Sequence, residues 1–282
     1  MLVISSRTVL ITGGARGLGL AYARALAETG AQVVISDLGT DRVGCGSDAS
    51  IAEAAAQSLR NEGHQVIGHS AELGDEQACQ QLLAKVLDAF GGLDALVHNA
   101  GWVGYQNVED SSADFIERAL AINVHAPLWL SKHAWPALKA SGSGRIVLTT
   151  SDRAMYLRHA QIGLGAYAAG KMAQLGIMNA LAAEGAEHGI RVNAISPVAR
   201  TRMWGQQGEP EDLKPEWVVP GVLHLASADC QDSGYILRAS NGQFCATRFE
   251  ENPQVDYPRE LRGVSASTVR EVRQRWQMIK AM

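Results

Sequence analysis

Residues 8–37 read TVLITGGARGLGLAYARALAETGAQVVISD and place a glycine-rich turn between two short apolar runs. Residues 9–12 and 32–36 are continuous, largely β-branched runs, which is typical of strands that are buried on both faces. Residues 18–28 between them are rich in alanine and leucine, which favours a helix. The stretch therefore predicts a strand–helix–strand unit with glycine residues at its first turn.

The same alternation continues along the chain. It predicts further strands at residues 65–68, 93–101, 144–150 and 190–195, and helices at residues 51–61, 76–90, 115–140 and 167–188. Buried strands separated by helices of this length indicate a parallel sheet with helices on both faces. We therefore predict a single-domain α/β protein, a Rossmann-type doubly wound parallel sheet in a three-layer α/β/α arrangement.

Two regions depart from this pattern. Residues 198–219 are rich in Gly, Pro and Trp and predict a surface excursion of the kind that forms a substrate loop. Residues 244–261 are polar and irregular, and they lead into a final helix with Ser265 or Ser267 as its cap. We predict a Rossmann domain over residues 1–245 and a C-terminal extension over residues 246–282 that is part of the same domain.

The composition narrows the classes of partner. Of the 282 residues, 46% are hydrophobic and 19% are charged, and the net charge is -4, as in an ordinary globular protein. No large basic field is available for a nucleic acid or an anionic membrane, and the apolar runs are too short to span a bilayer. We expect a small-molecule substrate instead.

The four cysteines form no CxxC pair, so we expect reduced thiols and no metal site. No signal-peptide pattern precedes the first strand, and the final residues IKAM are not a peroxisomal SKL-type address. These features predict a cytoplasmic protein.

The glycine-rich turn is the first candidate binding site. Gly13, Gly17 and Gly19 can let the backbone approach a pyrophosphate at a helix N-terminus, although any tight turn also uses glycine. Asp37 ends the second strand, where a carboxylate can accept hydrogen bonds from the ribose hydroxyls and repel a 2′-phosphate. This favours NAD over NADP. Arg16 favours the opposite choice, because a guanidinium near the ribose can hold a phosphate.

The fourth predicted strand ends in HNAG, residues 98–101, whose small residues leave room for a ligand at the sheet edge. We expect Asn99 to donate a hydrogen bond to the ribose or to the backbone, and His98 to serve in packing.

With these motifs in place, the sequence resembles the short-chain dehydrogenase/reductase family. The motifs are TGGARGLG, Asp37, HNAG, Asn123 in AINVHAP, Ser151, YAAGK at residues 167–171 and IRVNAISP, and they run in family order over essentially the whole chain. Within the family, the segments SDLG, GCGSDAS, LDAFGGLDALVHNAG, LKPEWVVPGVLHLAS and STVREVRQRW are similar to the (3R)-hydroxyacyl-CoA dehydrogenase domain of peroxisomal multifunctional (D-bifunctional) enzymes. Bacterial steroid-dehydrogenase relatives share much of this pattern.

The resemblance implies an NAD-dependent oxidoreductase, homodimeric or homotetrameric, that interconverts a secondary alcohol and a ketone. The implied substrate is a 3-hydroxyacyl-CoA or a hydroxysteroid. The implied cofactor-binding residues are Gly13, Arg16, Gly17, Leu18, Gly19, Asp37, Glu72, Leu73, Asn99, Ala100, Gly101, Tyr167, Lys171, Pro197 and Thr201. The chain departs from the family pattern in HNAG, which replaces NNAG, in the Glu72–Leu73 pair, and in SPVARTRM, where Thr201 is the nearest candidate for a contact to the nicotinamide amide.

Four residues are the candidate catalytic set. Tyr167 and Lys171 are four residues apart, so a helix places both on one face, and a nearby ammonium is expected to lower the pKa of the phenol. Tyr167 can then exchange a proton with the substrate oxygen, and Lys171 can also bind the nicotinamide ribose. Ser151, at the end of a strand, can stabilise the developing oxyanion. Asn123 resembles the residue that anchors a water leading to Lys171.

The segment between Ser151 and Tyr167 is longer than in most family members, so its extra residues are expected to bulge beside the substrate. Its charged residues predict either a polar contact for an acidic or CoA-bearing substrate or a solvated loop. Aromatic and aliphatic side chains nearby can form pocket walls or pack in the core. The candidate substrate-binding residues are Trp102, Arg153, Tyr156, Met203 and Trp204.

Two other functions stay open at this point. One is an NADPH-dependent 3-oxoacyl reductase, which relative affinities for NAD and NADP would distinguish. The other is a non-catalytic nucleotide-binding protein on the same fold, which would bind cofactor without turnover.

Overall fold

The structure is a computed structural model that describes residues 4–200 and 213–281. The chain divides after Thr247 into two units, close to the expected start of the C-terminal extension, and each unit is described by itself. That the extension is part of the same domain stays a prediction.

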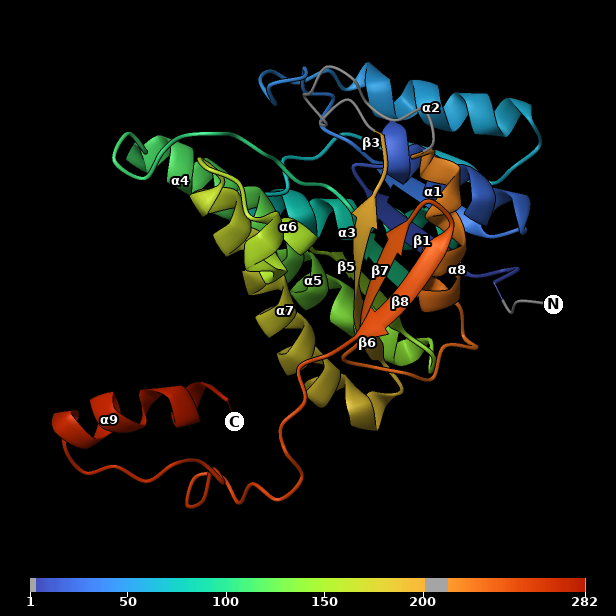
Figure 1. Ribbon diagram of the computed structural model, residues 1–282. Helices are drawn as coiled ribbons and strands as arrows, with labels where there is room; N and C mark the ends of the chain where they lie inside the picture. The colour runs from blue at the N-terminus through green and yellow to red at the C-terminus, as the bar shows by residue number, and fades with distance from the viewer. Residues whose placement is uncertain (1–3, 201–212, 282) are drawn as a thin grey trace. The chain divides into compact units, whose positions relative to one another are not determined.

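The first unit is built on an eight-stranded sheet in the order β3-β2-β1-β4-β5-β6-β7-β8 (Figure 1). All neighbouring pairs are parallel except β7 and β8. The strands are β1 Thr8–Thr12, β2 Gln32–Ser36, β3 Val66–His69, β4 Ala95–His98, β5 Arg145–Thr149, β6 Arg191–Val198, β7 Ile236–Ser240 and β8 Gln243–Thr247. The chain order reverses between β1 and β4, which is the switch point where open α/β sheets bind ligands.

Helices cover both faces of this sheet. One core contains α1, α2 and α8, and the other contains α3, α5 and α7, because alternate strand side chains such as Val9 and Leu10 point to opposite faces. The helices of the first unit are α1 Gly17–Glu28, α2 Ser50–Asn61, α3 Glu76–Phe90, α4 Ala113–Leu120, α5 Ala126–Ala140, α6 Asp152–Met155, α7 Gly165–Gly185 and α8 Val219–Ala226. The predicted doubly wound, three-layer fold is confirmed.

The helix predicted over residues 115–140 is interrupted. Between α4 and α5, Ala121–His125 form a π-helical turn that contains Asn123. A π turn widens one turn of the helix, and such turns often occur at functional sites.

The sequence-based account of the C-terminal third is wrong in part. Residues 236–240 form β7, which was not predicted, and residues 244–247 belong to β8 instead of an irregular segment. Asn241 and Gly242, with φ of 51° and 73°, form the two-residue hairpin between them. Of the predicted excursion, residues 201–212 lie outside the described residues. The last part of the excursion is not a loop as predicted. Pro215–Trp217 form a 3-10 turn, and α8 begins at Val219.

The last helix, α9 Val269–Lys280 in the second unit, starts later than its predicted caps. Thr268 is the N-cap, and its side chain accepts a hydrogen bond from the Glu271 amide. Ser265 and Ser267 are therefore wrong as caps. Ser267 instead donates from its amide and its hydroxyl to the Glu271 carboxylate.

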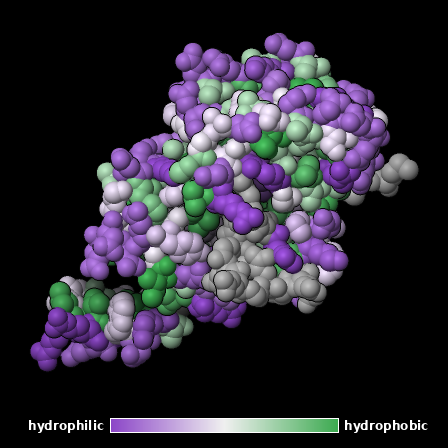
Figure 2. Space-filling model, turned by 90° about the horizontal axis from the view of Figure 1, so that it is seen from above, coloured by the Kyte–Doolittle hydropathy of each residue, from purple (hydrophilic) through white to green (hydrophobic). Residues whose placement is uncertain are grey.

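The face of the molecule in Figure 2 is mostly hydrophilic, with hydrophobic side chains in scattered groups. Within residues 4–200 and 213–281, no helix is both long and apolar enough to cross a membrane.

Arg145 is a charged residue inside the sheet that is held entirely by carbonyl groups. It is 2% exposed, and burial lowers the pKa of its guanidinium. It donates to the carbonyls of Ser227, Ala228, Gly189 and Gly144 over 2.8–3.2 Å. The side chain therefore satisfies the carbonyls that follow α8 and precede β6.

We predict that Arg145→Leu lowers the free energy of unfolding by about 3 kcal/mol, because four hydrogen bonds are lost and the Gly189 carbonyl keeps no other donor within the described residues. Arg191 is the matched control, since it pairs with Arg145 in the sheet register but its side chain donates only one described bond, to the Gln231 carbonyl at a more exposed site. Arg191→Leu should cost less than about 1 kcal/mol in urea unfolding. Equal losses in the two variants would contradict this account.

Candidate active site

A cavity of about 430 Å³ lies at the carboxyl ends of the central strands. It extends from the glycine-rich turn and Asp37 to Ser151, Tyr167 and Lys171. The predicted cofactor residues that line it are Gly13, Arg16, Gly17, Leu18, Asp37, Glu72, Leu73, Asn99, Ala100, Gly101, Tyr167, Lys171 and Pro197. Gly19 does not line the cavity, and Thr201 lies outside the described residues.

The turn after β1 is packed too tightly for side chains. Gly13 has φ of +60°, and a Cβ there would lie 2.9 Å from the Ala100 Cα; a Cβ on Gly19 would lie 2.0 Å from the Gly13 carbonyl oxygen. Asn99 Nδ2 donates to the carbonyls of Thr12 and Gly13, at 3.2 and 3.0 Å. Asn99 thus makes the backbone contact that was one of its two expected roles, and Gly19 lets α1 start against the turn.

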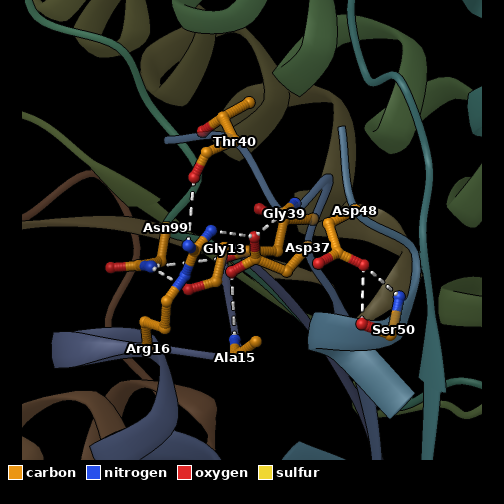
Figure 3. Close-up of polar contacts among 10 residues, drawn as sticks. Gly13, Ala15, Arg16, Asp37, Gly39, Thr40, Asp48, Ser50 and Asn99 are labelled. Carbon is orange, nitrogen blue, oxygen red and sulfur yellow. Dashed lines mark hydrogen bonds and ion pairs between the residues drawn. The ribbon is translucent and has the colours of Figure 1, made fainter. Parts of the chain in front are cut away.

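Asp37 is almost fully buried at the end of β2 and has three donors around its carboxylate (Figure 3). Its oxygens accept from the amides of Ala15 and Gly39, at 3.2 and 2.9 Å, and from Arg16 Nη2 at 2.9 Å. Arg16 Nη1 also donates to the Thr40 carbonyl at 3.0 Å. The two residues with opposite implications for the cofactor therefore form one ion pair.

The loop after β2 is fastened over the cavity by side chains that sequence analysis did not connect with the cofactor. Trp102 Nε1 donates to the Val43 carbonyl at 2.9 Å, and Arg118 donates to the Gly44 carbonyl. The Arg118 guanidinium lies 4.5 Å from the Trp102 ring centroid. Cavity-lining residues missed from the sequence include Leu38, Thr40, Asp41, Arg42 and Gly44 of this loop, and Arg118. The glycines of the GCGS stretch are a signal that could have indicated a turn there, but nothing in the sequence indicated Arg118.

Ser151 and Tyr167 meet at the other end of the cavity. Ser151 follows β5 and caps α6, and its Oγ accepts from the Arg153 amide at 3.3 Å. Burial raises the pKa of the Tyr167 phenol, and the nearby Ser151 side chain lowers it by less. The net shift is upward, so Tyr167 is a neutral phenol at pH 7.

Lys171 lies one turn beyond Tyr167 on α7, as expected from their spacing. Its Nζ donates to the Thr149 carbonyl at 2.9 Å and lies 5.9 Å from the Tyr167 ring centroid. Burial lowers the pKa of Lys171 to about 7. The expectation that a full ammonium lowers the Tyr167 pKa is therefore wrong for the protein by itself, because burial affects both groups more strongly.

Asn123 is completely buried in the π turn. Its Nδ2 donates to the carbonyls of Ala119 and Trp102 at 3.0 and 3.1 Å. Its backbone carbonyl accepts from Gln174 Nε2 at 3.1 Å. Its Oδ1 accepts no hydrogen bond within the described part of the chain. A Cβ placed on Gly101 would lie 3.2 Å from this Oδ1 and 3.1 Å from Lys171 Nζ. Asn123 Oδ1 and Lys171 Nζ therefore both lie beside Gly101, which is compatible with the predicted water between them.

The substrate candidates are more dispersed. Trp102 and Arg153 line the cavity, and Arg153 Nη1 donates to the Tyr105 hydroxyl at 3.1 Å. Tyr156 does not line the cavity and packs beneath Arg238, whose guanidinium lies 4.7 Å from the ring centroid. Met203 and Trp204 lie outside the described residues. The substrate roles of all five stay predictions.

His98 is buried, with its Nδ1 3.0 Å from the Thr12 hydroxyl. Burial lowers its pKa to about 3, so a neutral imidazole packs here. Among residues 4–200 and 213–281, no group of three His, Cys, Asp or Glu side chains could hold a metal ion.

These features fit a nicotinamide dinucleotide. The glycine turn leaves backbone space for a pyrophosphate at the start of α1, Asp37 and Arg16 lie where a ribose would end, and Lys171 lies at the catalytic end.

Residues 7–212 match the model of a protein family described as short chain dehydrogenase. The mouse peroxisomal multifunctional enzyme type 2 is 35% identical over 251 residues, which cover 86% of this chain but only 33% of that enzyme. The chain thus spans about a third of the length of that relative.

Two other proteins match over nearly their whole length. A putative short-chain type dehydrogenase/reductase of Mycobacterium tuberculosis is 30% identical over 268 residues, 93% of each chain. The crystal structure of a short chain dehydrogenase from Mycobacterium avium superposes with a TM-score of 0.83 at 27% identity, covering 99% of this chain and 96% of that one.

We predict that Lys171→Met makes the protein more stable. The folded pKa of about 7 lies below the unfolded value of about 10.4, so the unfolded state binds more protons between these pH values, and the free energy of unfolding rises with pH. Removing the amine should therefore raise stability at pH 7 by roughly 2 kcal/mol, after the loss of one hydrogen bond.

Urea unfolding between pH 7 and 10 tests this prediction. Lys171→Met should also flatten the increase in stability with pH, whereas the exposed Lys139→Met should leave both quantities unchanged. A destabilised Lys171→Met with the wild-type pH slope would show that the buried amine does not strain the fold.

Proposed function

The chain belongs to the short-chain dehydrogenase family, and from this membership we propose that it is an NAD-dependent dehydrogenase of 3-hydroxyacyl-CoA thioesters. The observation that carries the proposal is that Ser151, Tyr167 and Lys171, the last one helical turn beyond Tyr167, line the same cavity as the Gly13 turn and Asp37. The similarity to the mouse multifunctional enzyme supports the acyl-CoA class. A hydroxysteroid is the second substrate class.

In this proposal Ser151 holds the substrate oxygen. Its hydroxyl is fixed at the head of α6 and lies against Tyr167, so it can donate to the oxygen on which negative charge develops. A bound nicotinamide ring supplies the hydride acceptor for the alcohol, or the donor for the ketone. Lys171 is positioned to bind the adjacent ribose, since its amine faces the cavity from α7.

Tyr167 transfers the proton to or from the substrate oxygen. Its raised pKa keeps Tyr167 Oη protonated at neutral pH, the form that donates to a ketone. Alcohol oxidation requires the reverse transfer, from the substrate hydroxyl to Tyr167 Oη. The phenol must give up its own proton to accept that of the substrate. Lys171 Nζ can be protonated or neutral near pH 7, because its pKa is about 7, and is therefore suited to accept a relayed proton.

The cofactor choice rests on the Asp37–Arg16 pair. Asp37 favours NAD, since its carboxylate can accept from ribose hydroxyls and repels a 2′-phosphate. Arg16 favours an NADPH-dependent 3-oxoacyl reductase as the second candidate, because a guanidinium that leaves Asp37 can bind a phosphate. In the pair, Arg16 is already bonded to Asp37 and to the Thr40 carbonyl, which supports NAD.

We predict that Asp37→Ala lowers the ratio of NAD to NADP affinity at least about tenfold, because the acceptor is lost and Arg16 is released. Asp48→Ala is the control: Asp48 binds Ser50 and does not line the cavity (Figure 3). Calorimetric titration with both dinucleotides measures the ratio. If Asp37→Ala leaves it unchanged, Asp37 does not select the cofactor.

We predict that Tyr167→Phe lowers kcat by at least about 100-fold while the dissociation constant for NAD changes less than about threefold, since only the proton-transfer group is removed. The reaction to follow is NAD reduction with 3-hydroxydecanoyl-CoA. Tyr257→Phe, at an exposed position of the second unit, should retain wild-type turnover. Substantial residual turnover in Tyr167→Phe would contradict the proposal.

A non-catalytic nucleotide-binding role is the remaining alternative. It would be supported if the wild-type protein bound NAD but reduced none across hydroxyacyl-CoA and hydroxysteroid panels. The proposed homodimer or homotetramer can be checked on the same preparation by sedimentation equilibrium.

A further inference from the structure

The residue after Ser151 is a carboxylate that reaches away from the catalytic end toward the edge of the sheet. Asp152 lines the cavity and is 17% exposed in its side chain. Its Oδ1 accepts from the Ser196 hydroxyl on β6 at 2.8 Å and from Arg238 Nε on β7 at 3.1 Å. Its Oδ2 accepts from Arg238 Nε and Nη2, at 3.0 and 2.5 Å. Two strands thus hold one side chain.

Arg238 makes a forked, charge-assisted contact, which fixes both position and orientation. The guanidinium also packs over the Tyr156 ring, 4.7 Å from the ring centroid. Tyr156 ends the short helix α6 that Ser151 caps and Asp152 starts. Arg238 therefore contacts both ends of this helix while touching none of the catalytic side chains.

Apart from Met155, which packs against the core on the α7 side of the sheet, the helix has few anchors of its own. It is four residues long, none of its residues is buried, and helices of this length are not stable by themselves. Ser151 supplies the carbonyl that the amides of Ala154 and Met155 bond. A shift of α6 would therefore move Ser151, and small displacements of catalytic groups reduce rates strongly.

The charge of Asp152 adds a second effect. An unpaired carboxylate one residue from Ser151 would oppose the negative charge that develops on the substrate oxygen. The Arg238 guanidinium offsets that charge, and together with the Ser196 hydroxyl it holds the pKa of Asp152 below its usual range. Removing the charge of Arg238 should therefore lower kcat more than removing the charge of Asp152.

We propose that Asp152 and Arg238 are positioning residues that fix the Ser151 hydroxyl and neutralise the cavity wall beside it. The inference rests on the role of Ser151 in the proposed function. It assigns a part in the reaction to β7, which contributes no residue to the catalytic set.

The test measures kcat, KM for 3-hydroxydecanoyl-CoA and the dissociation constant for NAD in Arg238→Gln, Asp152→Asn and the double variant. Arg238→Gln should lower kcat roughly tenfold with NAD binding within about twofold. Asp152→Asn should lose less, and adding it to Arg238→Gln should restore part of the rate. Arg238→Lys should lie between wild type and Arg238→Gln, because it keeps the charge but not the fork.

Arg24→Gln is the matched control, since it breaks an arginine–carboxylate pair with Glu62 far along the sheet from this helix and should leave kcat unchanged. A purely structural role is separated by the Ser151→Ala background. There Arg238→Gln should cause a clearly smaller further loss of kcat, because the group it positions is gone and only the unpaired charge of Asp152 still acts. If Arg238→Gln does not fold, Asp152→Asn and Arg238→Lys give the same comparison.

The inference is overturned if Arg238→Gln keeps kcat within about twofold of wild type, or if its loss is the same with and without Ser151. Absent turnover of the wild-type protein, or full turnover of Ser151→Ala, would overturn the proposed function and this inference with it. An active enzyme that needs Ser151 but tolerates Arg238→Gln would overturn this inference alone.

Discussion

The candidate active site depends on a reciprocal tie between the end of β5 and α7. Lys171 Nζ donates to the Thr149 carbonyl, and the Thr150 hydroxyl donates to the Lys171 carbonyl at 2.8 Å. These two buried bonds fix how far α7 lies along the strand. They thereby place Tyr167, one turn earlier, against Ser151, which follows Thr150. The contact between phenol and serine is thus set by the packing of a helix on a sheet.

This tie is costly to the fold. A buried amine with a pKa of about 7, a raised phenol pKa and an Asn123 oxygen without a partner in the described chain lie within one part of the molecule. Buried polar groups that lack full compensation destabilise a protein, and strain of this kind collects at functional sites. The π turn has the same character, since it gives up regular helix geometry at the position of Asn123. The remainder of the sheet supplies the stability that this region lacks.

The central fold could be predicted because β1 to β6 are short, mostly apolar runs that alternate with helical segments, a pattern that can be read without tertiary information. The β7–β8 hairpin carried a signal too, since Asn241–Gly242 is a typical two-residue turn, but its strands are only five residues long and mix apolar with polar side chains. Other features had no sequence signal. The Asp152–Arg238 pair joins residues 86 apart in the chain, and the pKa shifts of Tyr167 and Lys171 follow from burial, which spacing alone does not reveal.

The central claim is that this site moves a hydride from a substrate alcohol to NAD. The most direct measurement uses 3-hydroxydecanoyl-CoA deuterated at C3, with mass spectrometry of the dinucleotide produced. The account predicts one deuterium in each reduced dinucleotide formed, together with one ketone. Reduced dinucleotide without deuterium, or bound NAD that is never reduced by this substrate or by hydroxysteroids, would contradict it.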